Sequence, residues 1–128
     1  MLAAAALVTA LLAAGCGEED FENNPRPAVP AEVSVKIADD GVAVSPREFG
    51  AGLVNFTVAN LTTRPGTLAI SGPVDADTPE IPPAGADTIK VAMKSGRYEA
   101  SVSGFAVKPF SFTVGPDRPS GQNDLLLP

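Results

Sequence analysis

The chain has 128 residues, and with 9 Lys and Arg against 15 Asp and Glu its net charge is −6. An acidic surface of this kind argues against binding to nucleic acid and against electrostatic adhesion to anionic lipid. The sequence contains no histidine. That absence excludes Ser-His-Asp and Cys-His nucleophilic sites and removes the most common metal ligand.

Cys16 is the only cysteine, and it ends an uncharged apolar run that begins at Met1 and gives way to Gly17-Glu18-Glu19-Asp20. The run is shorter than the roughly 20 apolar residues that a membrane-spanning helix needs. It resembles the export signal and lipobox of bacterial lipoproteins. The two small residues before Cys16 match that family, while Ala13 stands where its members usually have Leu.

The lipoprotein resemblance implies that residues 1–15 are a cleaved signal peptide and that Cys16 carries a diacylglyceryl group with palmitate-type acyl chains. Two such chains anchor a protein stably at a membrane. We therefore expect a protein held on the extracytoplasmic face of the cell membrane. Two alternatives stay open. The protein is secreted and Cys16 is incidental, or the apolar run is not cleaved and itself anchors the protein. No Lys or Arg precedes the apolar run, and we expect a start upstream of Met1, because signal peptides normally carry that positive charge.

Residues 16–31 have the composition of a tether. Repelling carboxylates occupy its first half, and Pro25, Pro27 and Pro30 favour extended geometry in the second. At about 3.3 Å per residue, the segment holds a domain up to roughly 50 Å from the membrane.

Residues 32–115 alternate apolar and polar side chains, with turn residues between the alternating segments. This pattern predicts about seven short strands in a two-sheet antiparallel sandwich, because each strand has one apolar face to bury. The alternating apolar residues are Val33, Val35, Ile37, Val42, Val44, Val54, Phe56, Val58, Leu68, Ile70, Ile89, Val91, Met93, Tyr98, Ala100, Val102, Phe110, Phe112 and Val114.

Two segments of the chain lack this alternation. Gly72-Pro73 opens a segment rich in Pro, Asp and Gly, which we expect to be a loop as far as about Ala86. Residues 116–128 read as a frayed or loosely docked tail, in which Leu125-Leu126-Leu127 is suited to pack on a sheet edge or a partner.

Three segments in a fixed order resemble the small cupredoxins, the blue-copper domains. They are residues 44–60, Ile81-Pro82-Pro83-Ala84-Gly85 with the strand after it, and Ser95-Gly96-Arg97-Tyr98-Glu99. The likeness covers residues 32–115 and implies a Greek-key sandwich.

The family's copper ligands are missing from the matching positions. A blue-copper site needs two imidazoles, a thiolate and usually a weak thioether. Gly66 stands where the resemblance places the first His, Val102 where it places the Cys, and residues 104–108 contain neither His nor Met. Met93 lies in an alternating segment and is predicted to be core. We therefore expect no metal and no cofactor.

Other candidate sites are weaker. Asp75, Asp77 and Glu80 share one loop, but they lack the spacing of a calcium-binding EF-hand, so a solvated acidic loop is favoured over weak calcium binding. Tyr98 follows a glycine turn, and we expect a structural tyrosine whose hydroxyl bonds to the backbone.

Phe105 and Val107 lie in the segment that carries the metal and the docking patch in the resembled family. They form a possible partner patch, and packing of Phe105 in the core is an equal alternative. If Phe105 contacts a partner, this loop is a binding surface; if Phe105 packs in the core, the loop only supports the fold.

The sequence predicts a non-enzymatic envelope lipoprotein. Its metal-free cupredoxin-like domain acts as a binding or scaffolding module, with a protein partner that the sequence does not identify. The alternative is a copper-handling or electron-transfer accessory protein of the cupredoxin family. The absence of His and of a cysteine in the domain favours the first.

Overall fold

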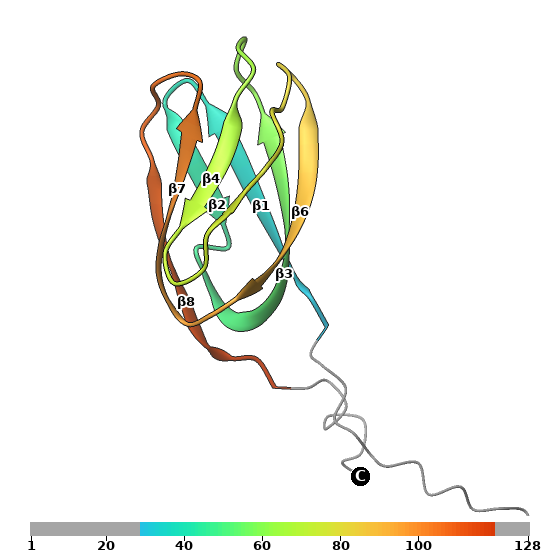
Figure 1. Ribbon diagram of the computed structural model, residues 1–128, viewed down its shortest axis with the longest axis vertical. Coiled ribbons are helices and arrows are strands. Elements are labelled where there is room, and N and C mark those ends of the chain that lie inside the picture. Colours follow the sequence, from blue (N-terminus) through green and yellow to red (C-terminus); the bar gives the residue numbers. More distant parts are fainter. Residues whose placement is uncertain (1–28, 120–128) are drawn as a thin grey trace, which may run out of the picture.

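The computed structural model describes residues 29–119, and within that range the chain is all β with no helix (Figure 1). Eight strands are present. They are β1 (Ala31–Ala38), β2 (Gly41–Ser45), β3 (Glu48–Asn60), β4 (Thr67–Ser71), β5 (Ala76–Asp77), β6 (Ala86–Met93), β7 (Gly96–Ser103) and β8 (Phe110–Asp117). The prediction of an all-β domain is confirmed. Cys16, the predicted signal peptide (residues 1–15) and residues 120–128 lie outside the described residues.

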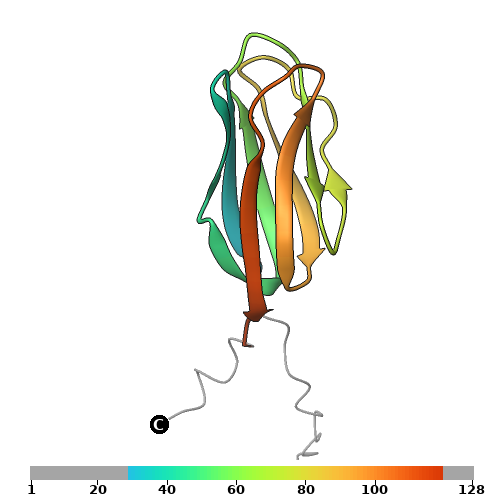
Figure 2. The same ribbon diagram turned by 90° about the vertical axis from the view of Figure 1, so that its left-hand side faces the viewer.

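β3 joins two groups of strands into one continuous sheet. Its first residues, 48–51, pair with β8, and the order continues through β7 and β4 to β5. Its later residues pair with β6 on one edge and with β1, followed by β2, on the other. Between the two parts the strand bends at Gly52, whose φ is 125°, and the register with β8 shifts between Gly50 and Ala51. The result is a sandwich-like fold in which β3 contributes to both halves (Figure 2).

Two strand pairings are parallel, so the expected purely antiparallel arrangement is wrong. β2 returns antiparallel beside β1, and β3 then crosses to the other edge of β1 instead of pairing with β2. A strand placed in this way runs in the same direction as β1. The sheet is therefore mixed.

The alternating apolar residues form the core, as predicted. Ile37, Val54 and Phe56 are completely buried, and Met93 is 3% exposed. A row of aromatic rings runs through the core, with centroids 5.5 Å apart for Tyr98 and Phe112 and 5.8 Å apart for Phe112 and Phe49. Offset stacking at such distances adds to the gain from burial.

The segment expected to be a loop from Gly72 to Ala86 contains additional order. Its two-residue strand β5 pairs with β4, and Ile81, which is 1% exposed, forms a bridge with Gly66. The eighth strand was missed because two residues are too few for alternation to be visible. β8 also continues to Asp117, two residues beyond the boundary drawn at 115.

The sandwich has two distinct ends. Residues 29 and 119 both leave at one of them, called the terminal end here (Figures 1 and 2). The opposite end, the loop end, is formed by the turn at 39–40 and by the loops 61–66, 78–85 and 104–109. Backbone hydrogen bonds tie these loops together, among them Val42 N to Lys108 O at 2.9 Å and Leu61 N to Ile37 O at 2.8 Å.

Candidate functional site

Asn60, the last residue of β3, organises the loop end. Its side chain is completely buried. Nδ2 donates to the carbonyl oxygens of Arg64 at 2.8 Å and Ile81 at 3.0 Å. Oδ1 accepts from the backbone N–H of Thr62 at 3.0 Å and from its hydroxyl at 2.7 Å. All four hydrogen-bonding positions of the amide are used, so one side chain fixes the loop 61–66 against the loop 78–85.

The three places where the cupredoxin resemblance positions metal ligands lie together at this end. A Cβ atom added to Gly66 would lie 2.8 Å from Cε1 of Phe105 and 3.1 Å from Cγ1 of Val102. The ring of Phe105 therefore occupies the space into which a side chain at position 66 would project. Hydrocarbon fills the region that the resemblance assigns to imidazole and sulfur.

Around this contact the loop end exposes a rim rich in apolar residues, among which the charged residues Asp39, Asp40, Arg64, Glu80 and Lys108 are also exposed. Phe105 and Val107 are half-buried and pack against the core, while Leu61 is 61% exposed. The other exposed apolar residues of these loops are Pro65, Pro79, Pro82, Pro83, Ala84, Ala106 and Pro109. The structure thus places the predicted patch of Phe105 and Val107 within a larger apolar rim, with each side chain partly engaged in packing.

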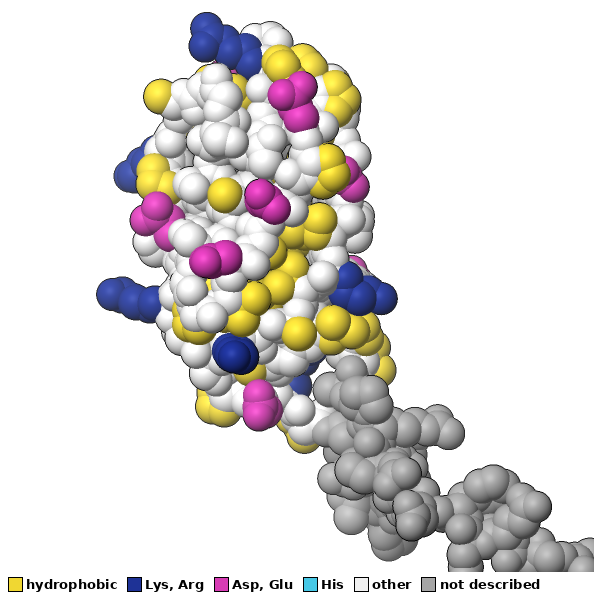
Figure 3. Space-filling view, viewed as in Figure 1, with side chains coloured by type: hydrophobic (Ala, Val, Ile, Leu, Met, Phe, Trp, Pro, Cys, Tyr) yellow, Lys and Arg dark blue, Asp and Glu magenta, His cyan; other side chains and the backbone are white. Residues whose placement is uncertain are grey.

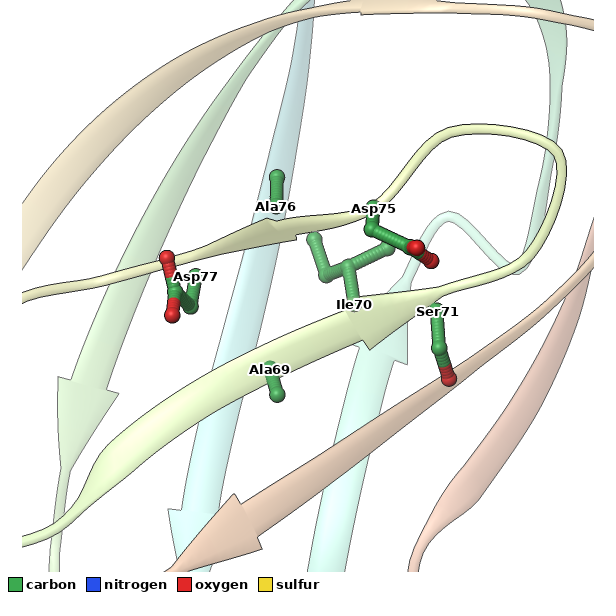
Figure 4. Close-up of a pocket in the computed structure, with 6 residues that line it drawn as sticks. All are labelled: Ala69, Ile70, Ser71, Asp75, Ala76 and Asp77. Carbon is green, nitrogen blue, oxygen red and sulfur yellow. The ribbon is translucent and has the colours of Figure 1, made fainter.

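The acidic loop does not form a cluster. Figure 4 shows Asp75 and Asp77 at opposite ends of a shallow depression of about 350 Å³, with Ile70 and Ala76 between them. Asp75 Oδ1 instead accepts from the backbone N–H of Gly72 at 3.2 Å. Among residues 29–119, no three carboxylate or cysteine side chains come close enough to hold a metal ion.

Tyr98 has the structural position expected of it, at the terminal end of the molecule. It is 3% exposed, and its hydroxyl donates to the carbonyl oxygen of Lys94 at 2.8 Å and accepts from the backbone N–H of Lys94 at 3.2 Å. Both bonds close the turn between β6 and β7. The tyrosine therefore stabilises a turn.

On the face drawn in Figure 3, basic and acidic side chains are interspersed, with apolar side chains between them. The described part of the chain has no helix long and apolar enough to cross a membrane. Cys16, the predicted lipid attachment site, lies outside that part.

The sequence reasoning identified Gly66, Val102 and Phe105 through the cupredoxin resemblance, but it missed the role of Asn60. The available signal was an Asn at the end of an alternating segment with Thr two residues later.

In the comparisons with known proteins, no family model and no curated protein matches the chain.

Proposed function

We propose that this chain is a bacterial envelope lipoprotein, anchored through Cys16 to the extracytoplasmic face of the cell membrane. Its sandwich is a cupredoxin-like Greek key that works without copper as a binding or scaffolding module. The loop end makes the contact with a protein partner. The sequence of residues 1–16 supports the anchor, and the order of the three cupredoxin-like segments supports the domain.

The observation that carries the proposal is the contact among Gly66, Val102 and Phe105. Two segments separated along the chain, the loop before β4 with Gly66 and the end of β7 with the loop after it, meet at the positions that the cupredoxin resemblance would use for metal ligands. None of the three residues supplies an imidazole or a thiolate. A pocket filled by a phenyl ring and a valine side chain suits surface recognition, since it offers apolar contact area and no redox group.

The direction of the chain supports the assignment of the loop end as the contact surface. β1 begins at Ala31, directly after the acidic and proline-rich segment, and its first residue lies at the terminal end. A domain attached to a membrane through that segment presents the opposite end outward. The apolar rim around Phe105 is then the part most accessible to a partner.

Crosslinking in the native envelope tests the partner surface. We expect Phe105→Ser to leave the domain folded and to reduce the yield of the crosslinked partner, because the ring is only half-buried. Phe110→Ser is the matched control, since Phe110 is also half-buried against the core but lies in β8. Equal capture by both variants contradicts the proposal. Loss of folding in Phe105→Ser alone assigns that ring to the core.

The anchor has its own test. Cys16→Ser removes the only thiol in the chain, and we expect the protein to leave the membrane fraction or to stall before processing. Fractionation followed by mass measurement of the N-terminal peptide reports both results. A fully processed Cys16→Ser protein that remains in the membrane fraction contradicts lipid attachment.

A further inference from the structure

A shallow apolar groove of about 450 Å³ runs over the outer face of β1, β2 and β3. Small side chains form its floor, among them Ala43, Thr57 and Ala59. Lys36 lines the groove, and Leu61 closes it towards the loop end. A leucine that is 61% exposed beside such a floor leaves apolar surface in water, which a covering segment would remove.

The chain leaves the sandwich at the foot of this same strand. The backbone N–H of Arg118 donates to the carbonyl oxygen of Ala51 at 3.0 Å. Its side chain donates through Nη1 to the carbonyl oxygen of Gly50 at 3.0 Å and through Nη2 to that of Leu53. Three bonds to the bend of β3 fix the position of Arg118 beside that bend, close to the end of the described chain; Figure 2 shows β8 running down to this end of the sandwich.

Beyond Arg118 no free edge of β3 is available for the chain to pair with. From Val54 onward one edge of β3 is taken by β1, which begins there with Ala31, and the other edge is taken by β6. A continuation of β8 alongside β3 is therefore blocked. The chain has to leave the plane of the sheet, and Leu53, which is 37% exposed, is the first residue of the outward row on β3.

The outward-facing residues of β3 from Leu53 to Ala59 pass from polar to apolar surroundings along the strand. The chain after Arg118 passes from polar to apolar residues in the same order. After Leu53 comes a polar part, in which Asn55 Nδ2 donates to Glu32 at 2.8 Å, and then the groove. The chain continues with polar residues 120–124 and then with Leu125-Leu126-Leu127.

The lengths also agree. Seven extended residues from Arg118 to Leu125 span about 23 Å. Six strand residues from Leu53 to Ala59 span about 20 Å. A chain that starts at the bend and follows β3 therefore brings its leucines to the groove.

We propose that residues 120–128 fold back along the outer face of β3 and that Leu125-Leu126-Leu127 occupy the groove. The polar residues 120–124 then cover the pair of Glu32 and Asn55, and Asp124 approaches Lys36. The occupant is a segment of the same chain. This inference does not depend on the proposed function.

A spin label tests the docking in the full chain in mild detergent. The label is placed at Asn123→Cys in a Cys16→Ser background, which leaves one thiol. We expect loss of intensity for the amide signals of Ala43, Thr57 and Ala59 in the isotope-enriched protein. Ser111 and Thr113, which are exposed on β8, are expected to keep full intensity. Loss of intensity at neither set, or equally at both, overturns the proposal.

Two further samples identify the occupant. Replacing all three leucines, Leu125→Ser, Leu126→Ser and Leu127→Ser, is expected to restore the groove signals, and persistence of the effect overturns the role of the leucines. In the second sample, spin-labelled chain without isotope is mixed with unlabelled enriched chain. We expect no loss of intensity there, and loss at the groove means that a second copy supplies the leucines, which overturns docking within one chain.

Discussion

The loop end and the terminal end of the sandwich are both closed by side chains that bond to backbone groups, but the bonds are distributed differently. At the loop end, the completely buried Asn60 makes four hydrogen bonds by itself. At the terminal end, three side chains, those of Tyr98, Arg118 and Ser95, each bond to different backbone groups. Ser95 Oγ, for example, donates to the carbonyl oxygen of Gly115 at 2.6 Å.

The difference shows how a surface can be left available. Because Asn60 holds two loops from inside, the exposed side chains of those loops, such as those of Pro65 and Pro82, make none of the four bonds that join the loops. These side chains are available for contact with another molecule. The terminal end has no such single support, and its bonds lie in partly exposed places where water competes with them.

The largest expected effect is that of Asn60→Ala. Four hydrogen bonds inside the fold disappear, although the carbonyl oxygens of Arg64 and Ile81 each keep one other donor. We expect the free energy of unfolding to fall by about 3–4 kcal/mol. Urea unfolding measures it. Asn55→Ala is the control, because its bond to Glu32 is exposed and its loss should cost about 0.5 kcal/mol or less. A loss below about 1 kcal/mol for Asn60→Ala contradicts a single internal support.

A smaller effect is expected at the terminal end. Tyr98→Phe removes the hydroxyl that bonds to Lys94 but keeps the ring stacked on Phe112. We expect a loss of about 1–1.5 kcal/mol in the same urea measurement, since one turn is affected and the core is kept. A loss equal to that of Asn60→Ala would remove the contrast between the two ends.

The smallest expected effect is that of copper. Titration of the chain with Cu(II) is expected to produce no intense visible charge-transfer band, because the chain contains no histidine and its only cysteine, Cys16, lies outside residues 32–115. Absorption spectroscopy measures it. An intense band would restore the alternative of a copper-handling accessory protein and would turn the loop end into a metal site.

The sequence was sufficient for those features of the fold that depend on alternation. Val33, Val35 and Ile37 predicted an apolar face, and the structure buries all three. Alternation does not reveal which strand lies beside which, because a period of two is the same for parallel and antiparallel neighbours. The parallel pairs of β3 therefore could not be read from it.

The candidate site was predictable only in part, and for a related reason. The resemblance brought Gly66, Val102 and Phe105 to attention, yet their contact depends on loops that no local pattern positions. Arg118 follows Gly115-Pro116-Asp117, which is typical of a tail, and its bonds to the bend of β3 depend on residues more than sixty positions away.

The parallel pairing of β1 with β3 has a mechanical consequence. The chain enters β1 at the terminal end. A partner bound at the loop end, as we propose, would hold the opposite pole of the domain. A pulling force between the two is directed along β1, and the bonds of the paired residues from Ala31–Val54 to Ile37–Asn60 carry it together in shear instead of opening one after another. The sandwich is thus built to resist tension along its long axis.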